Sequence, residues 1–258
     1  MANYYLDVKN VSRGKGRSVT KLANYISGRT LRDGYKGVTY YRHRQDVLYC
    51  NIFQPVAAPP DFCELQRLCN EIDKAEVRRD ARTAREFKGS LPNELPLQEQ
   101  IRIVSEFIHI NFVDQSLCAI AAIHEGKNVD DPSRNNPHVH IIVPTRPVGP
   151  DGFCLKKDRE HDKRKYINAW REQWACVQNR AYERSGLDVR VSHECLEVQG
   201  VHDREPTVYL RLADWQREKR GERTRAGDLK RKVDARNKAW ALQRQVERER
   251  VHEIELSR

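Results

Sequence analysis

The chain has 258 residues, of which 33% are charged and 38% hydrophobic, and its formal net charge at pH 7 is +10. A chain of this length buries a hydrophobic core without disulfide bonds, and it holds no run of the roughly 20 apolar residues that a membrane-spanning helix needs. The excess of basic residues favours an anionic partner, most often nucleic acid. A basic surface that only keeps the protein in solution is the alternative that composition leaves open.

The cysteines and the first residues indicate the cellular compartment. The seven cysteines are irregularly spaced, and no two of them form a Cys-x-x-Cys pair. This usage is typical of reduced thiols and argues against a disulfide framework or a zinc ribbon. The first eight residues are too few and too mixed for the apolar region of a secretion signal. The sequence therefore predicts a cytoplasmic protein.

The first predicted elements are a strand, a loop and a helix. Residues 6–11 have the pattern of a strand, and residues 12–17 that of a flexible basic loop. Ser18 is a good N-cap for a helix. Apolar residues then recur at helical spacing over 19–26, and Gly28 is suited to end the helix.

The middle of the chain alternates between further strands and helices. Residues 29–51 are rich in Tyr, Arg, Gly and Val, which suggests short strands or a hairpin. A helix is expected over 61–85, after a proline-rich breaker, and a short strand over 86–91. Another helix is expected over 98–113.

The second half of the chain holds two segments with the pattern of buried strands. Residues 117–123 and 138–143 are short and apolar and are bounded by polar residues. A helix is expected over 161–185, with Trp170 and Trp174 among its apolar residues.

The last part of the chain differs in composition. From Asp214 onward, almost every residue is charged or small, which predicts a helical tail that packs poorly by itself. We therefore expect one domain over residues 1–210 and a charged helical extension over residues 211–258.

Three histidines carry the strongest chemical signal. His138 and His140 are separated by one residue, so in a strand their side chains point to the same face. His124 directly follows the preceding apolar segment. If the two strands are antiparallel neighbours, the loop between them returns His138 beside His124. Three imidazoles then meet around one divalent cation and leave positions open for substrate and water, the usual pattern of a catalytic metal.

The same histidines allow other interpretations. Histidines that lie near one another can be structural, and a single His-x-His is a weak motif. A nucleotide hydrolase of the histidine-triad type would carry a third histidine at the next alternate position of the strand. That position is Ile142, so a hydrolase of this type would lack its nucleophile.

A strongly basic segment surrounds one tyrosine. Residues 1–44 contain ten basic and two acidic residues, so +8 of the net charge lies here. Arg13, Lys15 and Arg17 are candidates for contacts with DNA phosphates, and tyrosines of the segment can stack on bases. Tyr25 lies about 110° from the centre of its helix's apolar stripe, at the edge of the buried face. The alternative is a solvated basic face around a core tyrosine.

Five blocks follow one another along the chain: Ser12–Ser18 with Ala23–Gly28, Ala84–Glu86 before Leu91–Pro92, Asn136–Ile142 with Thr145–Pro147, Trp170–Trp174, and Gln199–Gly200 with Glu205–Thr207. Together they resemble the MobA/MobL family of plasmid mobilisation relaxases, within the HUH endonuclease superfamily. The resemblance covers about residues 1–210. There are two departures from the family. The loop between His124 and His138 is several residues longer, and Asn24 stands where the family tends to have alanine.

This resemblance implies a fold and a reaction. The fold is α+β: a mainly antiparallel central sheet with helices packed on its faces, the strand of His138 and His140 at its centre, and the Tyr25 helix above it. In the reaction, the Tyr25 hydroxyl attacks a phosphodiester of single-stranded plasmid DNA at the origin of transfer. The protein becomes linked to the 5′ phosphate, a 3′ hydroxyl leaves, and the strand is rejoined after conjugative transfer.

The resemblance also implies the roles of other residues. Glu86 is expected to act as the general base, since a phenol is a poor nucleophile at neutral pH. His124, His138 and His140 are expected to hold magnesium or manganese, and zinc or nickel also suits imidazole ligands. Arg146 is a candidate for a phosphate contact or for a pair with an acidic residue.

Partners and rival functions follow from the same comparison. The expected partners are accessory mobilisation proteins and the coupling protein of a type IV secretion system, and such a protein can leave the cell with the transferred DNA. A rolling-circle replication initiator or a transposase shares the nicking step, although the order of the blocks argues against both. A non-enzymatic basic DNA-binding protein and a metallohydrolase without a covalent step are the other two alternatives.

Overall fold

The fold was analysed in a computed structural model that describes residues 4–129, 131–132 and 135–256. The chain forms two compact units, Met1–His193 and Glu194–Arg258. The boundary expected at residue 210 therefore lies within the second unit. Among the described residues, no helix is both long enough and apolar enough to cross a membrane.

The first unit is built on a five-stranded sheet whose paired strands all run antiparallel. Along the sheet the strands follow the order β1-β5-β7-β6-β4. Their bounds are Leu6–Ser12 for β1, Val47–Phe53 for β4, Arg82–Ser90 for β5, Ala119–His124 for β6 and His138–Pro144 for β7. The central strand is β7, the strand of the histidine pair. The expected antiparallel sheet with this strand at its centre is confirmed.

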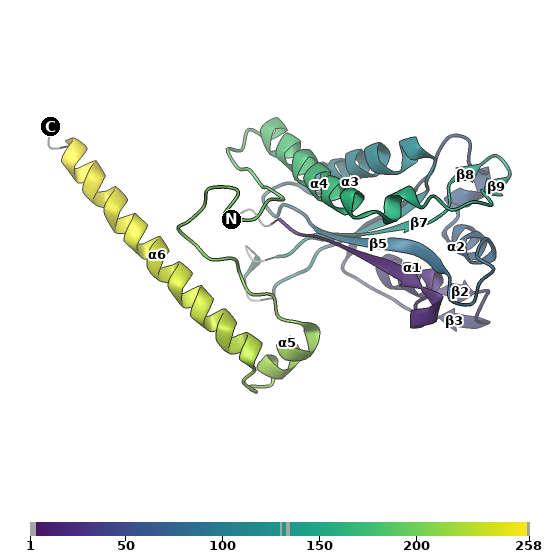
Figure 1. The fold of residues 1–258 in the computed structure, drawn as a ribbon, viewed down its shortest axis with the longest axis horizontal. Coiled ribbons are helices and arrows are strands. Elements are labelled where there is room, and N and C mark those ends of the chain that lie inside the picture. Colours follow the sequence, from purple (N-terminus) through teal and green to yellow (C-terminus); the bar gives the residue numbers. More distant parts are fainter. Residues whose placement is uncertain (1–3, 130, 133–134, 257–258) are drawn as a thin grey trace. The chain divides into compact units, whose positions relative to one another are not determined.

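Two helices, α3 (Leu97–Asn111) and α4 (Arg164–Arg184), cover one face of the sheet (Figure 1). Val139, Ile141 and Val143 point into this layer and are almost completely buried, because they occupy alternate positions of β7. The approach of α4 is close. A Cβ built on Gly89 of β5 would lie 2.7 Å from the ring of Trp174, so no larger residue fits there without displacing the helix.

Two other helices, α1 (Val19–Ser27) and α2 (Leu65–Lys74), pack against the opposite face. This second core joins apolar residues of the sheet to those of the two helices: Val11, Ala84, Ile120, Ala122, Ile142, Val19, Ala23, Ile26, Leu68 and Ile72. The alternation of β7 places the histidines on this face, since His138, His140 and Ile142 share it. The helix that carries Tyr25 therefore covers the histidine side of the sheet, as expected.

Short elements complete the molecule. They are two small hairpins, β2–β3 (Leu31–Asp33 and Val38–Tyr40) and β8–β9 (Val148–Gly149 and Gly152–Phe153), and the 3-10 turns η1 (Arg13–Lys15), η2 (Pro60–Cys63), η3 (Val113–Gln115) and η5 (Glu160–Asp162). The second unit contains α5 (Leu212–Lys219) and α6 (Arg225–Leu256), which agrees with the helical tail expected from composition.

One expected element is wrong in its extent. The helix predicted over 61–85 begins as a short 3-10 turn, continues as α2 and ends at Lys74. From Arg82 the chain is already strand β5, which is paired on both sides, with β1 and β7. Pairing with two neighbouring strands outweighs the helical propensity of the Ala and Arg residues in this segment.

Candidate metal and tyrosine site

The three histidines converge at one end of β6 and β7. His124 is the last residue of β6 and lies opposite His138, the first residue of β7. The ring centroids of His138 and His140 are 5.3 Å apart, and those of His124 and His140 are 5.0 Å apart. One nitrogen from each ring lies within 4.8 Å of the other two. Nitrogen ligands of one cation lie at most about 4.2 Å apart, so small ring rotations close the set.

Hydrogen bonds fix two of the rings. His124 Nε2 lies 2.8 Å from the carbonyl oxygen of Ile26 in α1, and His138 Nδ1 lies 2.8 Å from that of Asn136. A carbonyl only accepts, so both nitrogens carry protons and donate. The remaining nitrogens, His124 Nδ1 and His138 Nε2, are left with lone pairs. A backbone carbonyl that fixes the tautomer of an imidazole is the usual support of a metal ligand.

The third ring contacts a carboxylate. His140 Nδ1 lies 3.4 Å from Glu86 Oε1, which is long for a hydrogen bond, so the contact is mainly electrostatic. Neither nitrogen of His140 reaches a hydrogen-bond partner among the residues that the structure describes, and the same holds for His124 Nδ1. Buried nitrogens without partners are costly, and a bound cation would satisfy those that face the triad. The donor set therefore fits a metal ion.

Burial keeps the imidazoles neutral. Removal from water lowers the pKa of His124 to about 4 and that of His138 to about 4, although each donates to a carbonyl that opposes the shift. A metal ligand must be unprotonated. Both rings are therefore ready to bind a cation over the whole physiological pH range.

Tyr25 lies against this triad. Its ring stands edge-on to His140 at 5.7 Å and to His124 at 6.1 Å between centroids. The side chain is half-buried, as expected for a residue at the edge of the apolar stripe of α1. The neighbouring Ile26 provides the carbonyl that holds His124. One turn of helix thus positions both the phenol and a histidine of the triad.

Glu86 lies beside the triad but is not free. It forms an ion pair with Arg17 and contacts His140. Burial alone would raise the pKa of Glu86, but the contacts with His140 and Arg17 outweigh it and lower the pKa to about 2. Glu86 is therefore a carboxylate at neutral pH and a weak proton acceptor. The arrangement fits a residue that orients His140 better than a general base.

Arg13 requires a correction. It was expected to contact DNA phosphates, yet its side chain is only 4% exposed. Its guanidinium donates to the carbonyl oxygens of Glu76 and Asp73 and pairs with the Asp73 carboxylate at 3.0 Å. It also stacks on the ring of Tyr35. Arg13 holds the basic loop to the end of α2, whereas Lys15, at the tip of the loop, is exposed.

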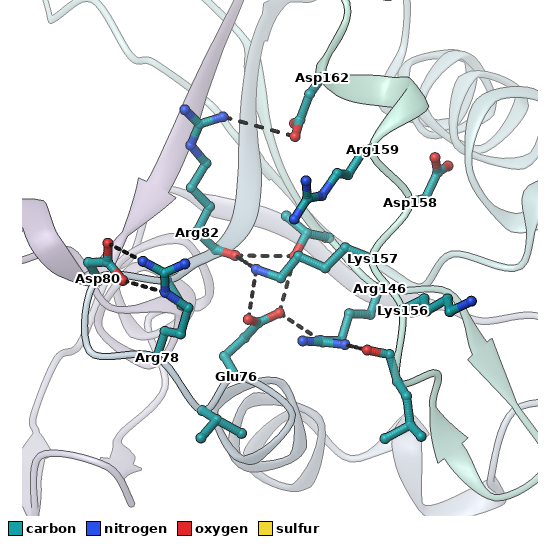
Figure 2. A pocket seen from close by; sticks show the side chains of 14 residues that line it. Glu76, Arg78, Asp80, Arg82, Arg146, Lys156, Lys157, Asp158, Arg159 and Asp162 are labelled. Carbon is teal, nitrogen blue, oxygen red and sulfur yellow. Dashed lines mark hydrogen bonds and ion pairs between the residues drawn. The ribbon is translucent and has the colours of Figure 1, made fainter.

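Arg146 also requires a correction. It follows the far end of β7, about 20 Å along the strand from His138. Its Nε donates to Glu76 Oε1 at 2.8 Å and its Nη1 to the carbonyl of Cys154 at 3.1 Å. Figure 2 shows it turned toward Glu76 on the wall of a polar cavity of about 780 Å³. Arg146 is a structural residue of that cavity. Of the two roles that the sequence suggested for it, the structure shows the pair with an acidic residue, Glu76.

The structure adds three basic residues that the sequence did not single out. The guanidinium groups of Arg42 and Arg44 lie over the ring of Tyr25 at 4.7 and 4.6 Å. Lys88 of β5 is in register with His140 on the same face. The sequence does contain two closely spaced arginines, in Arg42-His43-Arg44. Only the folded chain shows that this segment returns to α1 and places them over Tyr25.

The chain is similar to a known protein family and to curated relatives. The model of the MobA/MobL family matches residues 17–220. Mobilization protein A of Escherichia coli is 31% identical over 256 residues, which is 92% of this chain and 33% of that protein. The probable mobilization protein MobA of Bifidobacterium longum is 28% identical over 252 residues, covering 81% of this chain and 43% of that protein. The chain thus spans less than half the length of these relatives.

Solved structures share the fold. A protein studied for vancomycin resistance transfer in Staphylococcus aureus superposes with a TM-score of 0.67 at 25% identity, over 75% of this chain and 100% of that one. The conjugative relaxase TrwC, solved with oriT DNA and metal, superposes with a TM-score of 0.50 at 13% identity, over 92% and 96% of the two chains. Together with the match of the family model over most of the chain, these similarities establish that the protein belongs to the MobA/MobL family.

Proposed function

We propose that this protein is a mobilisation relaxase that nicks one DNA strand at a plasmid's origin of transfer and later rejoins it. The observation that carries the proposal is the position of Tyr25, whose ring lies edge-on to two members of a three-histidine cluster. A phenol beside a cation site is the pair of groups needed to attack a phosphodiester and to stabilise the charge that develops on it.

The bonds change as follows. The Oη–H bond of Tyr25 breaks, and Oη forms a bond to the phosphorus of the scissile phosphodiester. The bond from phosphorus to the 3′ oxygen breaks, and that oxygen takes up a proton and leaves as a hydroxyl. The 5′ side stays covalently attached to Tyr25. One phosphodiester replaces another, so attack by a 3′ hydroxyl rejoins the strand.

The triad supports the attack. His124 Nδ1, His138 Nε2 and the nitrogen of His140 that faces away from Glu86 would hold the ion. When bound, the ion supplies Lewis-acid stabilisation of a phosphate oxygen. Magnesium or manganese is the working ion that we propose, and zinc or nickel suits the same imidazoles. Glu86 keeps His140 in place, and Arg17 keeps Glu86 ionised.

The substrate that we propose is single-stranded origin DNA. The half-buried Lys88 shares the histidine face of the sheet, and Lys15 is an exposed basic residue of the loop before α1. Positive charge at these places neutralises backbone phosphates without reading sequence. Accessory mobilisation proteins and a type IV coupling protein are the further partners that we propose, with nicking in the bacterial cytoplasm.

An adduct assay tests the function. A labelled single-stranded oligonucleotide from the origin of the protein's own plasmid is incubated with protein and manganese, and covalent product is separated under denaturing conditions. We expect wild-type adduct that maps to Tyr25 by mass spectrometry and disappears with chelator or in Tyr25→Phe. Tyr41→Phe, which removes the hydroxyl of an 82% exposed tyrosine, should keep the full yield. Full adduct yield from Tyr25→Phe would refute the assignment.

A further inference from the structure

Two arginines lie over the proposed nucleophile. The guanidinium carbons of Arg42 and Arg44 are 4.7 and 4.6 Å from the centroid of the Tyr25 ring. Both distances fall within the range of cation–π attraction. The two residues follow β3 and precede β4, so the chain returns from the β2–β3 hairpin across the end of α1. Tyr25 is therefore enclosed by histidines on one side and by arginines on another.

Arg44 is held rigidly. Its Nε donates to Asp46 Oδ1 at 2.8 Å, its Nη2 pairs with the other carboxylate oxygen, and its Nη1 donates to the backbone carbonyl of Tyr25 at 3.3 Å. The hydrogen bonds to Asp46 raise the pKa of Arg44, and Tyr25 adds to the shift. Its charge and its place over the ring are thus both fixed.

The backbone is shaped to admit this residue. Gly28 ends α1 in the left-handed conformation, with φ of 68°. A Cβ built on Gly28 would lie 3.2 Å from Arg44 Cβ and 3.3 Å from its amide nitrogen. The end of the nucleophile's helix and the arginine segment therefore touch at a point where a side chain would crowd them.

Arg42 differs from Arg44 in one respect. It is exposed, and among the residues that the structure describes no carboxylate pairs with it. Asp46 neutralises Arg44, whereas the positive charge of Arg42 has no such partner among the described residues. A phosphate group placed for attack by the Tyr25 oxygen would supply the missing negative charge.

We propose that Arg44 positions the Tyr25 ring and that Arg42 binds the phosphate that Tyr25 attacks. This rests on the function proposed above. As Oη loses its proton and bonds to phosphorus, the positive charge of Arg44, which Asp46 holds in place, stabilises the oxygen in the transition state and needs no rearrangement to do so. The charge of Arg42 pairs with the phosphate. The same charges attract the backbone of the DNA strand before the attack.

Four variants test the proposal: Arg44→Gln, Arg44→Lys, Arg42→Gln and Arg32→Gln. Arg32 is the matched control, because it is an exposed arginine of the same basic segment in strand β2. Single-turnover rates of adduct formation on the origin oligonucleotide are measured at pH 7, and dissociation constants are measured by fluorescence anisotropy.

Arg44→Gln should slow adduct formation by about 10- to 100-fold at pH 7, with a dissociation constant within about threefold of wild type. Arg44→Lys should recover part of the rate. Arg42→Gln should weaken DNA binding by about tenfold, and Arg32→Gln should keep the wild-type rate and affinity.

The outcomes separate the two claims. A wild-type adduct together with wild-type rates and affinities in both Arg42→Gln and Arg44→Gln overturns this inference and leaves the proposed function standing. If wild type forms no adduct, the proposed function fails and the inference with it. If Arg44→Gln does not fold, the double variant Arg44→Gln with Asp46→Asn is used in its place. It removes both members of the ion pair and leaves no unpaired carboxylate at Asp46. A wild-type rate of adduct formation in that double variant also rejects the role of Arg44.

Discussion

Single residues determine whether the histidine cluster binds a metal. His138→Ala or His140→Ala removes one of the three histidines that we propose as ligands. We expect each variant to lose ion affinity by at least about 100-fold, together with nicking. Isothermal titration with manganese measures this, and His202→Ala, an exposed histidine of the second unit, is the control. Unchanged affinity in both triad variants would refute the ligand set.

Glu86 can be assigned by separating ion binding from proton transfer. If it orients His140, Glu86→Gln should weaken the ion about 10- to 100-fold, and saturating manganese should restore most of the nicking rate. If Glu86 accepts the phenol proton, ion affinity should stay at the wild-type value while the rate falls at every manganese concentration. The low pKa of Glu86 makes the first result the expected one.

The stability of the metal-free protein should depend on pH through the buried histidines. The pKa values of His124 and His138 are lowered to about 4 by burial, whereas an unfolded histidine titrates near 6.5. Between these values the unfolded chain binds more protons. The free energy of unfolding is therefore highest above pH 6.5 and falls as the pH is lowered toward 4.

This loss is at most about 3 kcal/mol for the fully buried His124 and smaller for the partly exposed His138. Urea unfolding in chelator at pH 7.5, 6, 5 and 4 measures it. The variant His124→Asn should show a weaker dependence on pH than wild type. Equal free energies of unfolding at pH 7.5 and pH 4 in the wild-type protein would contradict the burial argument.

At the scale of single residues, the sequence predicted that the three histidines meet. It did not predict the contacts that hold Arg13 and Arg44 in place. The alternation of His138 and His140 follows from strand geometry, and the register with His124 follows from one antiparallel pair. The burial of Arg13 depends on Asp73, sixty residues away in sequence. The placement of Arg44 over Tyr25 depends on the path of the chain after β3. No local pattern carries either contact.

Among the elements, α1 is the one that links the fold to the chemistry. Its ends follow local rules: Ser18 accepts a hydrogen bond from the amide of Lys21 at 3.2 Å, and Gly28 ends the helix with a positive φ. Both ends were therefore predictable from sequence. The end of α2 at Lys74 was not predictable from sequence. Residues 82–85, which were expected to continue the helix, instead form part of β5 and pair with β1 and β7.

Substitution at the end of α1 tests this link. Gly28→Ala places a Cβ in the left-handed conformation and against Arg44, at a cost of about 1–2 kcal/mol in stability. We expect a lower melting temperature and a slower nicking rate, because Arg44 must shift. Gly37→Ala is the matched control: it has a similar φ of 67° but meets no atom within 4 Å. Equal nicking rates in the two variants would show that the Arg44 contact does not matter.

At the scale of the whole molecule, we expect the affinity for DNA to depend on where the positive charge lies. Most of the net charge lies in residues 1–44, and the structure leaves Lys15 and Arg42 exposed within this segment. Replacing both with glutamine should reduce the slope of log affinity against log salt by about 0.7 for each lost phosphate contact. Arg102→Gln, on the helix that covers the opposite face, is the control. A wild-type slope in the double variant would exclude both residues as phosphate contacts.

The architecture of the first unit was predictable, because short apolar segments with alternating histidines and amphipathic helices leave few arrangements. The division of the chain into two units was less predictable. The change in composition that suggested a boundary at residue 210 marks where charged helices begin, whereas the compact first unit already ends at His193. The boundary of a compact unit depends on contacts between residues that are distant in sequence, and composition contains no information about these contacts.

The hydrogen bond between His124 and the carbonyl of Ile26 has a consequence for regulation. It joins a histidine of the triad to the residue next to Tyr25, so under the proposed function ion binding and DNA attachment would be coupled. Coupling of this kind is reciprocal. If attachment of DNA at Tyr25 changes the affinity for the ion by some factor, the ion changes the equilibrium between linked and released DNA by the same factor. The supply of divalent cation in the host would thereby set how long the plasmid end stays tethered to its carrier.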